Sequence, residues 1–360
     1  MKGALLLVLV MVVAGATPMM AGSAEREVIG HYLWLAGGSS VYLSDDEGRT
    51  WRGVSTGLPE RTDISAIVAM PGSQPTAVAA VSLGTGGDSA VFRFAEGAWQ
   101  PCEAAPTEWI RQLLRAWHPG GAASLYAVAG GDLWRTADGG KTWRSRPLPD
   151  EEAGIAGGFD GKRELIYARA EKGLYLSIDM IGPWMRRDSG LPLEKEGMVT
   201  AVADNPVHVY AVTDEREVYE TRSGGLRWRL AAWRPSRSEF TDVPTICGMV
   251  AVGPLPATVF VHGGGYINPM ATGWDCLLRG RGSTWEVVSR GLKSFDLCPV
   301  HPATLWYVCS NETWDPDRSP EWKPEYRLFR VSPAATGGPV EVGPVPAAES
   351  YSLSVACRLP

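Results

Sequence analysis

One eight-residue pattern recurs along this chain and constrains its fold more than any other feature. Residues 44–51 read SDDEGRTW, and residues 136–143 read TADGGKTW. Self-similarity at intervals of 20 to 50 residues is the sequence sign of a repeat architecture. Weaker copies end at four further tryptophans, and the six together are spaced 41 to 57 residues apart: Trp51, Trp99, Trp143, Trp184, Trp228 and Trp285.

Each repeat also contains the signals of four short strands. An alternating apolar segment, a turn that usually contains proline and a second alternating segment precede the pattern, as in residues 64–81 and 199–212. Alternation with period two indicates strands, and the Gly and Pro clusters indicate turns. A seventh unit at 327–342 keeps the strand but lacks the tryptophan. We therefore predict an all-β fold, a seven-bladed β-propeller of four-stranded antiparallel blades.

The two ends of the chain provide an independent test of this prediction. We call the strands of a blade a, b, c and d, in chain order. Residues 31–44 align with strands b and c of a later unit, so the first unit lacks its strand a. The last residues, 350–360, have the pattern of a strand a. We therefore expect the C-terminal strand to join the N-terminal blade, which would close the ring and remove its open edges.

The repeated pattern itself has the composition of a tight turn between strands c and d. Its Asp can accept hydrogen bonds from nearby backbone N–H groups, its Gly can adopt a positive φ, and its Trp can pack beneath the turn. The alternative is metal binding or acid–base catalysis by these aspartates, but similar copies in four blades cannot all line one active site. We predict structural roles for Ser44, Asp46, Gly48, Thr50, Trp51, Thr136, Asp138, Gly140, Thr142, Trp143, Ser177, Asp179, Trp184 and Trp228.

These residues resemble the Asp-box, or BNR, repeat of sialidases and other propellers. The boxes at 44–51 and 136–143 match at each defining position, whereas Ile181 replaces the Gly of the third and Ser223 replaces the Asp of the fourth. The whole chain resembles exported propellers related to the photosystem II stability/assembly factor. That resemblance implies a binding scaffold or assembly helper, with the boxes remote from any catalytic centre.

The N-terminal segment predicts export from the cytoplasm. Residues 1–24 combine Lys2, a short apolar run and small residues that would allow cleavage after residue 16 or 24, as in a signal peptide. An uncleaved anchor is the alternative, although Pro18 weakens a spanning helix. We expect a periplasmic, cell-surface or secreted monomer, with residues 25–360 as a single propeller domain and no membrane insertion after signal removal.

Composition and cysteine spacing narrow the chemistry further. A net charge of −6 without a basic block disfavours nucleic-acid binding. No metal-ligand spacing and no phosphate-binding Gly loop is present, so we predict no cofactor and no metal. Cys298 and Cys309 flank a turn near residue 303 and are a candidate disulfide pair, and two small buried thiols are the alternative.

The candidate binding surface is the face opposite the boxes, where loops can vary without disturbing the turns. Two long b–c loops, 263–275 and 310–326, carry aromatic and charged residues suited to a protein or sugar interface. The alternatives are a loop folded back on the last blade and a solvated rim. The predicted binding residues are Tyr266, Trp274, Trp314, Asp315, Asp317, Arg318, Trp322 and Tyr326 on these loops, and Arg61, Trp109, Arg111 and Arg237 on the d–a side, where Asp296 also lies.

The sequence favours binding over catalysis. We expect a non-catalytic scaffold that recognises an extracytoplasmic protein, or a glycan, through this face. The alternative is a carbohydrate-active hydrolase. A sialidase-like enzyme needs three arginines and a Tyr–Glu pair, and Arg61, Arg111 and Arg237 are the arginines available for such a trio. No Tyr–Glu pair can be identified, and the pair of carboxylates that other glycosidases need is not marked by any motif.

Overall fold

The computed structural model of the protein describes most of the chain from residue 28 onward. The described residues are 28–60, 62–84, 88–118, 123–192, 197–202, 205–213, 217–231, 245–253, 257–265, 274–281, 284–298, 303–310, 325–333, 338–347 and 351–358. Within these ranges the chain forms strands β1 to β28 and no α-helix. None of the described residues belongs to a helix long and apolar enough to cross a membrane. The residues of the predicted export signal lie outside the described ranges.

Five of the sheets in the described chain have four antiparallel strands each. Their strands, from the centre of the ring outward, are β28 (Ser352–Arg358), β1 (Gly30–Gly37), β2 (Ser40–Ser44) and β3 (Arg52–Gly53); β4 (Asp63–Met70), β5 (Thr76–Ser82), β6 (Ser89–Ala95) and β7 (Ala98–Pro101); β8 (Ile110–Trp117), β9 (Ala123–Ala129), β10 (Asp132–Thr136) and β11 (Arg144–Pro147); β12 (Gly154–Phe159), β13 (Glu164–Ala170), β14 (Gly173–Ile178) and β15 (Ile181–Arg186); and β24 (Leu292–Cys298), β25 (Thr304–Ser310), β26 (Tyr326–Val331) and β27 (Val340–Pro344).

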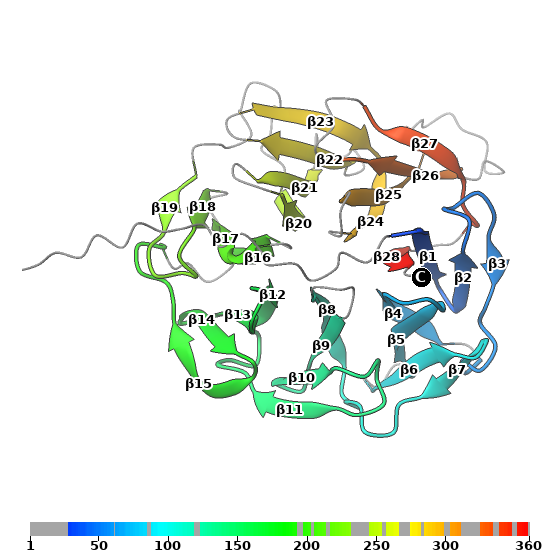
Figure 1. The fold of residues 1–360 in the computed structure, drawn as a ribbon, viewed down its shortest axis with the longest axis horizontal. Helices are drawn as coiled ribbons and strands as arrows, with labels where there is room; N and C mark the ends of the chain where they lie inside the picture. Colours follow the sequence, from blue (N-terminus) through cyan, green and yellow to red (C-terminus); the bar gives the residue numbers. More distant parts are fainter. Residues whose placement is uncertain are drawn as a thin grey trace, which may run out of the picture.

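A sixth sheet has eight strands and consists of two four-stranded antiparallel halves. One parallel bridge, between Val202 and Ala251, joins the halves through their innermost strands. The sheets stand side by side around a common centre (Figure 1). The predicted all-β propeller of four-stranded units is confirmed, and the count of seven blades stays a prediction. The halves are β16 (Gly197–Val202), β17 (Asn205–Thr213), β18 (Val218–Thr221) and β19 (Arg229–Leu230), and β20 (Thr245–Val252), β21 (Thr258–Gly265), β22 (Trp274–Arg281) and β23 (Thr284–Arg290).

The C-terminal strand completes the N-terminal unit, as predicted. Strand β28 pairs antiparallel with β1, from Gly30 opposite Arg358 to Ala36 opposite Ser352. The two ends of the described chain therefore lie side by side (Figure 1). This pairing occupies the inner edge of β1, which would otherwise expose unpaired N–H and C=O groups.

In three units, a tryptophan side chain donates a hydrogen bond to the unit that precedes it in the chain. The indole N–H of Trp99 donates to the carbonyl of Val54 at 2.7 Å, across the boundary between the β1 and β4 units. Trp184 donates to Pro147 at 2.9 Å in the same way, and Trp228 donates to Arg187 at 2.7 Å. These three tryptophans therefore lie between units, whereas Trp143 donates to the carbonyl of Gly140 in its own turn.

The apolar core lies in the spaces between neighbouring units. Trp34 from β1 contacts Phe94 from β6 and Trp99 from β7, with ring centroids 4.9 and 5.9 Å apart and the rings edge to face. All three side chains are buried. Burial of large aromatic surfaces between sheets provides much of the free energy that holds such units together.

The candidate disulfide between Cys298 and Cys309 is not formed. Cys298 is disulfide-bonded, but Cys309 is a thiol. The strand register explains the error, because β24 and β25 place Cys298 opposite Thr304 and Cys309 opposite Leu292. The two cysteines therefore lie at opposite ends of the strand pair, beyond the reach of an S–S bond.

A glycine between units tests this packing. Gly57 has φ of +95°, and a Cβ at this position would lie 2.2 Å from the carbonyl oxygen of Trp99. We expect Gly57→Ala to lower the free energy of unfolding by at least about 1 kcal/mol, measured by urea denaturation. Gly38→Ala is the matched control, since Gly38 has φ of +57° and open space around its Cβ position. Equal losses in the two variants would show that backbone strain alone, without the contact, sets the cost.

Candidate functional site

The innermost strands of the units surround a central cavity of about 480 Å³. Its lining comes from β4, β8, β12, β16, β20, β24 and β28, so every unit contributes. Most of the lining is small or apolar: Ala66, Leu113, Ala156, Gly157, Ala201, Val250 and Phe295 are representative. Such a cavity is large enough for a small ligand or for the side chains of an inserted segment.

A buried ion pair crosses this cavity. Arg115 from β8 lies 3.0 Å from an oxygen of Asp296 on β24, and the Arg115 side chain is only 5% exposed. The same guanidinium donates to the carbonyl of Ala69 on β4 at 2.5 Å, and its Cζ lies 4.2 Å from the centre of the Trp117 ring. Burial lowers the pKa of Arg115, and the charge of Asp296 opposes that shift.

The carboxylate of Asp296 accepts hydrogen bonds from Arg115 and from three further donors. Besides Arg115, its Oδ2 accepts from the Ser354 hydroxyl at 2.9 Å and from the Val355 N–H at 2.8 Å. Its Oδ1 accepts from the N–H of Leu297 at 2.8 Å. Asp296 is the one carboxylate among the described lining residues. It therefore connects β8, β24 and β28.

Side chains of other inner strands form similar bonds to the free edge of the next strand. Ser352 and Ser354 on β28 accept from the N–H groups of Ile67 and Ala69 on β4, at 3.3 and 2.9 Å. The amide of Gln112 on β8 both donates to and accepts from the backbone of Ile155 on β12, at 2.8 and 2.9 Å. These bonds satisfy backbone groups that would face the cavity unpaired.

Few of the predicted binding residues have described side chains. Trp109 and Arg111 lie together at the start of β8, whereas Tyr326 starts β26 on another unit and packs on Tyr351, with ring centroids 4.6 Å apart. For Trp274 only the backbone, at the start of β22, is described. The other predicted binding residues lie outside the described ranges: Arg61, Arg237, Tyr266, Trp314, Asp315, Asp317, Arg318 and Trp322.

Trp109 is the most exposed large aromatic side chain of the described residues, at 58%. Its backbone is held on both sides. Glu108 forms a β-bridge with Asp88, and the Ile110 N–H donates to the hydroxyl of Ser89. Leu83 is also exposed and donates its N–H to the carbonyl of Asp88, so it belongs to the same part of the rim. We name Leu83 and Trp109 the Trp109 rim.

Arg111 is fixed beside the Trp109 rim. Its guanidinium donates to the carbonyl of Glu151 and lies 3.5 Å from the carboxylate of Glu152, both on the loop before β12. This arrangement uses Arg111 to join two units. The arginine trio that a sialidase-like site would require includes Arg61 and Arg237, which lie outside the described residues.

The two complete boxes share one hydrogen-bond pattern. Asp46 accepts from the Thr50 N–H at 2.9 Å, the Thr50 hydroxyl at 2.6 Å and the Ser44 hydroxyl at 2.8 Å. Asp138 accepts from Thr142 and Thr136 at the same distances. Desolvation opposes ionisation of both aspartates, but these bonds outweigh it and lower each pKa to about 2.

The third box differs. Asp179 does not bond residues later in its own turn. Instead its Oδ1 accepts from the N–H of Glu164 at 2.7 Å, and its own N–H donates back to the Glu164 carbonyl at 2.9 Å. Ser177 accepts from Arg146 of the preceding unit at 2.9 Å. The degenerate sequence at this position therefore forms a different turn.

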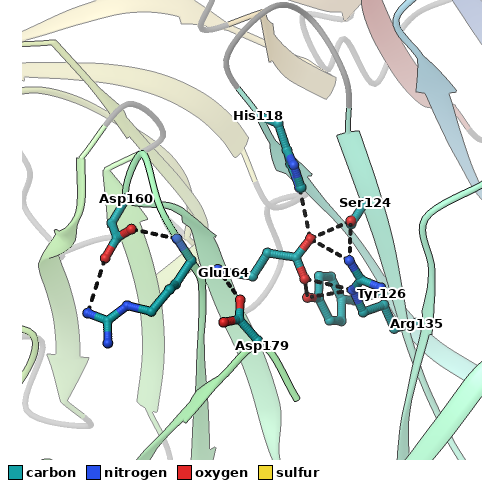
Figure 2. Close-up of polar contacts among 8 residues, drawn as sticks. His118, Ser124, Tyr126, Arg135, Asp160, Glu164 and Asp179 are labelled. Atoms are coloured by element: carbon teal, nitrogen blue, oxygen red, sulfur yellow. Dashed lines mark hydrogen bonds and ion pairs between the residues drawn. The ribbon is translucent and has the colours of Figure 1, made fainter. Parts of the chain in front are cut away.

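Sequence reasoning missed a buried polar cluster around Glu164 (Figure 2). The Glu164 carboxylate accepts hydrogen bonds from Ser124, Tyr126 and Arg135 of the preceding unit, the last at 2.6 and 2.9 Å. His118 Nε2 lies 2.8 Å from the same carboxylate. Desolvation opposes ionisation, but these partners outweigh it and hold the pKa of Glu164 well below its usual range. A lone acidic residue at the head of the apolar strand ELIYARA was the available signal.

The Glu164 cluster contains the side-chain types of a catalytic site, but its geometry is that of a connector. Ser124 donates to the carboxylate, so its hydroxyl is not activated by His118. The cluster joins β9 and β10 of one unit to β13 of the next. Among the described residues, no group of three or more His, Cys, Asp or Glu side chains could hold a metal ion.

Comparison with known proteins supports the fold alone. No protein-family model matches the chain, and no curated protein matches it. A structure from a study of two prolyl endopeptidases matches with a TM-score of 0.55 at 12% identity, over 92% of this chain and 49% of that chain. This chain thus spans about half of that protein.

Two further solved structures have lower scores. "YCF48 bound to D1 peptide" matches with a TM-score of 0.49 at 13% identity, over 85% of this chain and 88% of that chain. The GH74 enzyme of Niastella koreensis matches with a TM-score of 0.43 at 13% identity, over 80% of this chain and 45% of that chain. At these identities and scores, neither assigns a function to this chain.

The Arg115–Asp296 pair predicts a large effect on stability. We expect Asp296→Ala to lower the free energy of unfolding by about 3 kcal/mol, because it leaves the Arg115 charge buried without a partner. Denaturation in urea measures the change. Adding Arg115→Met should recover part of the loss, since the uncompensated charge is then removed. Losses that simply add in the double variant would show that the pair is not coupled.

The two complete boxes predict a loss of stability in acid. Their aspartates have pKa values of about 2 in the folded protein, against 3.8 ordinarily. The stabilisation is therefore fully present above pH 4 and is lost as the pH falls toward 2. We expect the double variant Asp46→Asn, Asp138→Asn to be less stable at pH 7 and to lose less stability between pH 4 and pH 2, measured by thermal unfolding. An unchanged acid profile would show that other carboxylates dominate.

Proposed function

We propose that this protein is a non-catalytic binding module that acts outside the cytoplasm and holds a partner protein on the face opposite the boxes. The observation that carries this proposal is the Trp109 rim, where a large aromatic side chain is 58% exposed on a fixed backbone. Tryptophan is among the residues most enriched at the energetic centres of protein interfaces. A side chain whose backbone is already ordered loses little entropy on binding.

The position of Trp109 also fits this role. Trp109 immediately precedes β8, whose residues Gln112 to Arg115 line the central cavity. A partner seated on the Trp109 rim would therefore lie at one end of the cavity, where an inserted apolar side chain could be buried among small and apolar lining residues. The loops 263–275 and 310–326, with Trp314 and Trp322, belong to the same predicted surface.

The geometry favours binding over glycoside hydrolysis. A glycosidase needs one carboxyl group that donates a proton and a second that acts as base or nucleophile. Asp296, the carboxylate of the described lining, is held by Arg115 and three further donors. The described lining offers no second carboxylate that could act together with Asp296.

The experiment is site-specific crosslinking in the native host. A photoreactive amino acid at position 109 should give a discrete crosslinked product with one exported protein, and Trp109→Ala should reduce recovery of that protein about tenfold or more. The control is the same pair of changes at Val340, which is 54% exposed on β27. Equal crosslinking at both positions, or undiminished recovery with Trp109→Ala, would exclude the Trp109 rim. Trp314→Ala with Trp322→Ala tests the long loop in the same assay.

A further inference from the structure

Cys298, the last residue of β24, is disulfide-bonded and fully buried. The chain contains six cysteines, and three of the other five are thiols: Cys102, Cys276 and Cys309. The partner of Cys298 within the chain is therefore either Cys247 or Cys357.

The two candidates lie on the two strands that neighbour β24. Cys247 belongs to β20 and Cys357 belongs to β28. Both strands stand beside β24 around the centre of the ring (Figure 1). The order of the strands therefore allows either bond. Two further observations decide between them: the direction in which Cys298 faces, and the position of each candidate along its strand.

Cys298 faces the unit that contains β28. It belongs to an apolar cluster with Leu353 and Val355 of that strand. Leu297, the preceding residue, belongs to a different cluster together with Val252 of β20. Successive side chains of a strand point to opposite faces, so these two clusters lie on opposite sides of β24. The Cys298 side chain therefore points toward β28 and away from β20.

Hydrogen bonds fix the register between β24 and β28. The Leu353 N–H donates to Ser294 Oγ at 2.9 Å, and the Val355 N–H donates to Asp296 Oδ2 at 2.8 Å. Both bonds join positions 59 residues apart, so the two strands run in the same direction. Continued by two residues, the same offset places Cys357 beside the last residue of β24.

Cys247 lies too far along β20 to reach Cys298. The last strand pair before the turn is Cys298 with Thr304 in one unit and Val252 with Thr258 in the other. Val252 is therefore the counterpart of Cys298, and Cys247 lies five positions earlier. Five residues of a strand span about 16 Å, whereas the Cα atoms of a disulfide are only about 6 Å apart.

Two of the described thiols are poor competitors for this bond. Burial raises the pKa of the Cys102 thiol and of the Cys309 thiol to about 11. The thiolate is the form that attacks a disulfide, and it is scarce at neutral pH when the pKa is this high. These two thiols are therefore slow to exchange with a disulfide once it has formed.

We infer that Cys298 and Cys357 form a disulfide that closes the ring covalently. Backbone pairing joins β28 to β1 within the first unit. The disulfide joins β28 to β24 of the last unit, so it crosses the boundary at which the two ends of the ring meet. The pair is a modification site, and the reaction partner that it requires is a thiol–disulfide oxidoreductase in its disulfide form.

The bond forms by two exchange steps. The thiolate of one cysteine attacks a sulfur of the oxidoreductase disulfide, forms a mixed disulfide and releases one oxidoreductase thiolate. The thiolate of the other cysteine then attacks the sulfur of the first, and the second oxidoreductase thiolate leaves. The two cysteines lose two electrons and two protons, and the oxidoreductase gains them as two thiols. Such oxidants act in compartments outside the cytoplasm, so covalent closure takes place there.

Peptide mapping tests the pairing directly. The full chain, produced in an oxidising compartment, is denatured with N-ethylmaleimide and digested without reductant. We expect the peptide of Cys298 to be linked to the peptide of Cys357 until a reductant is added, and the other cysteines to carry the label. A link between Cys298 and Cys247, or label on Cys298, would overturn the inference.

Serine variants test whether the bond stabilises the ring. Cys298→Ser and Cys357→Ser should each lower the midpoint of thermal unfolding by about 5 °C or more. The double variant should lose little more than either single variant, because one bond is removed in all three. Cys102→Ser, which removes a thiol, is the control and should change the midpoint less. Losses that add in the double variant would show that the two residues act separately.

Hydrogen exchange tests where the bond acts. In Cys357→Ser, the amides of β28 should exchange about tenfold faster or more, because the strand can open from the last unit. The amides of β12, in a unit that does not touch this boundary, are the control and should be unchanged. Equal acceleration in both strands, or none in β28, would contradict a local role in closing the ring. Peptide mapping of the unmodified chain decides the pairing even if a variant fails to fold.

This inference is independent of the proposed function. The Trp109 rim belongs to other units, and none of these variants changes it. The crosslinking result at position 109 can therefore fail while the disulfide is found, and the reverse also holds.

Discussion

The pairing of β28 with β1 is the contact on which the rest of the structure depends. It joins segments separated by nearly the whole chain, and it gives the first unit its innermost strand. Beside the cavity, β28 also forms hydrogen bonds with the inner strands of its two neighbouring units. Asp296 of β24 accepts from the Val355 N–H, and Ser354 of β28 accepts from the Ala69 N–H of β4. Without β28, each of these neighbours would face an unfilled position in the ring.

Two kinds of contact hold neighbouring units together, and they act at different radii. Near the centre, Gln112, Asp296 and Ser354 bind the free backbone edges of adjacent inner strands. Farther out, indole N–H groups such as that of Trp99 bind carbonyls of the preceding unit, above a packed aromatic core. The central contacts satisfy polar groups around the cavity, and the outer contacts bury apolar area.

The architecture could be predicted from the sequence because the same four-strand pattern recurs several times along it. The alternation of apolar and polar residues predicted the strands. The pairing of β28 with β1 was predicted because the first unit lacks a strand a and residues 350–360 have the pattern of one. Pairing across a turn was harder, because symmetrical spacing around residue 303 does not determine register. The register places Cys298 opposite Thr304, and the candidate bond between Cys298 and Cys309 is not formed.

The site was less predictable than the fold. Trp109 and Arg111 could be placed on one face from topology, since both precede an inner strand. The Arg115–Asp296 pair could not, because its members are 181 positions apart and only the closed ring brings them together. Glu164 gave a weak signal for the same reason, since the described partners of its carboxylate lie in the preceding unit. The incomplete boxes also carry information. Ile181 and Leu226 are recognised as unusual only when their boxes are aligned with the two complete ones.

The closure of the ring also determines when the protein can be complete. Strand β1 comes early in the described chain, and its inner partner, Ser352–Arg358, comes much later. During synthesis, β1 therefore has an open edge until β28 is made, and an open edge is a template for incorrect strand pairing. A circular permutant that starts at β28 and continues into β1 would build this unit from neighbouring residues. In the natural order, the first unit is complete only once β28 has been made.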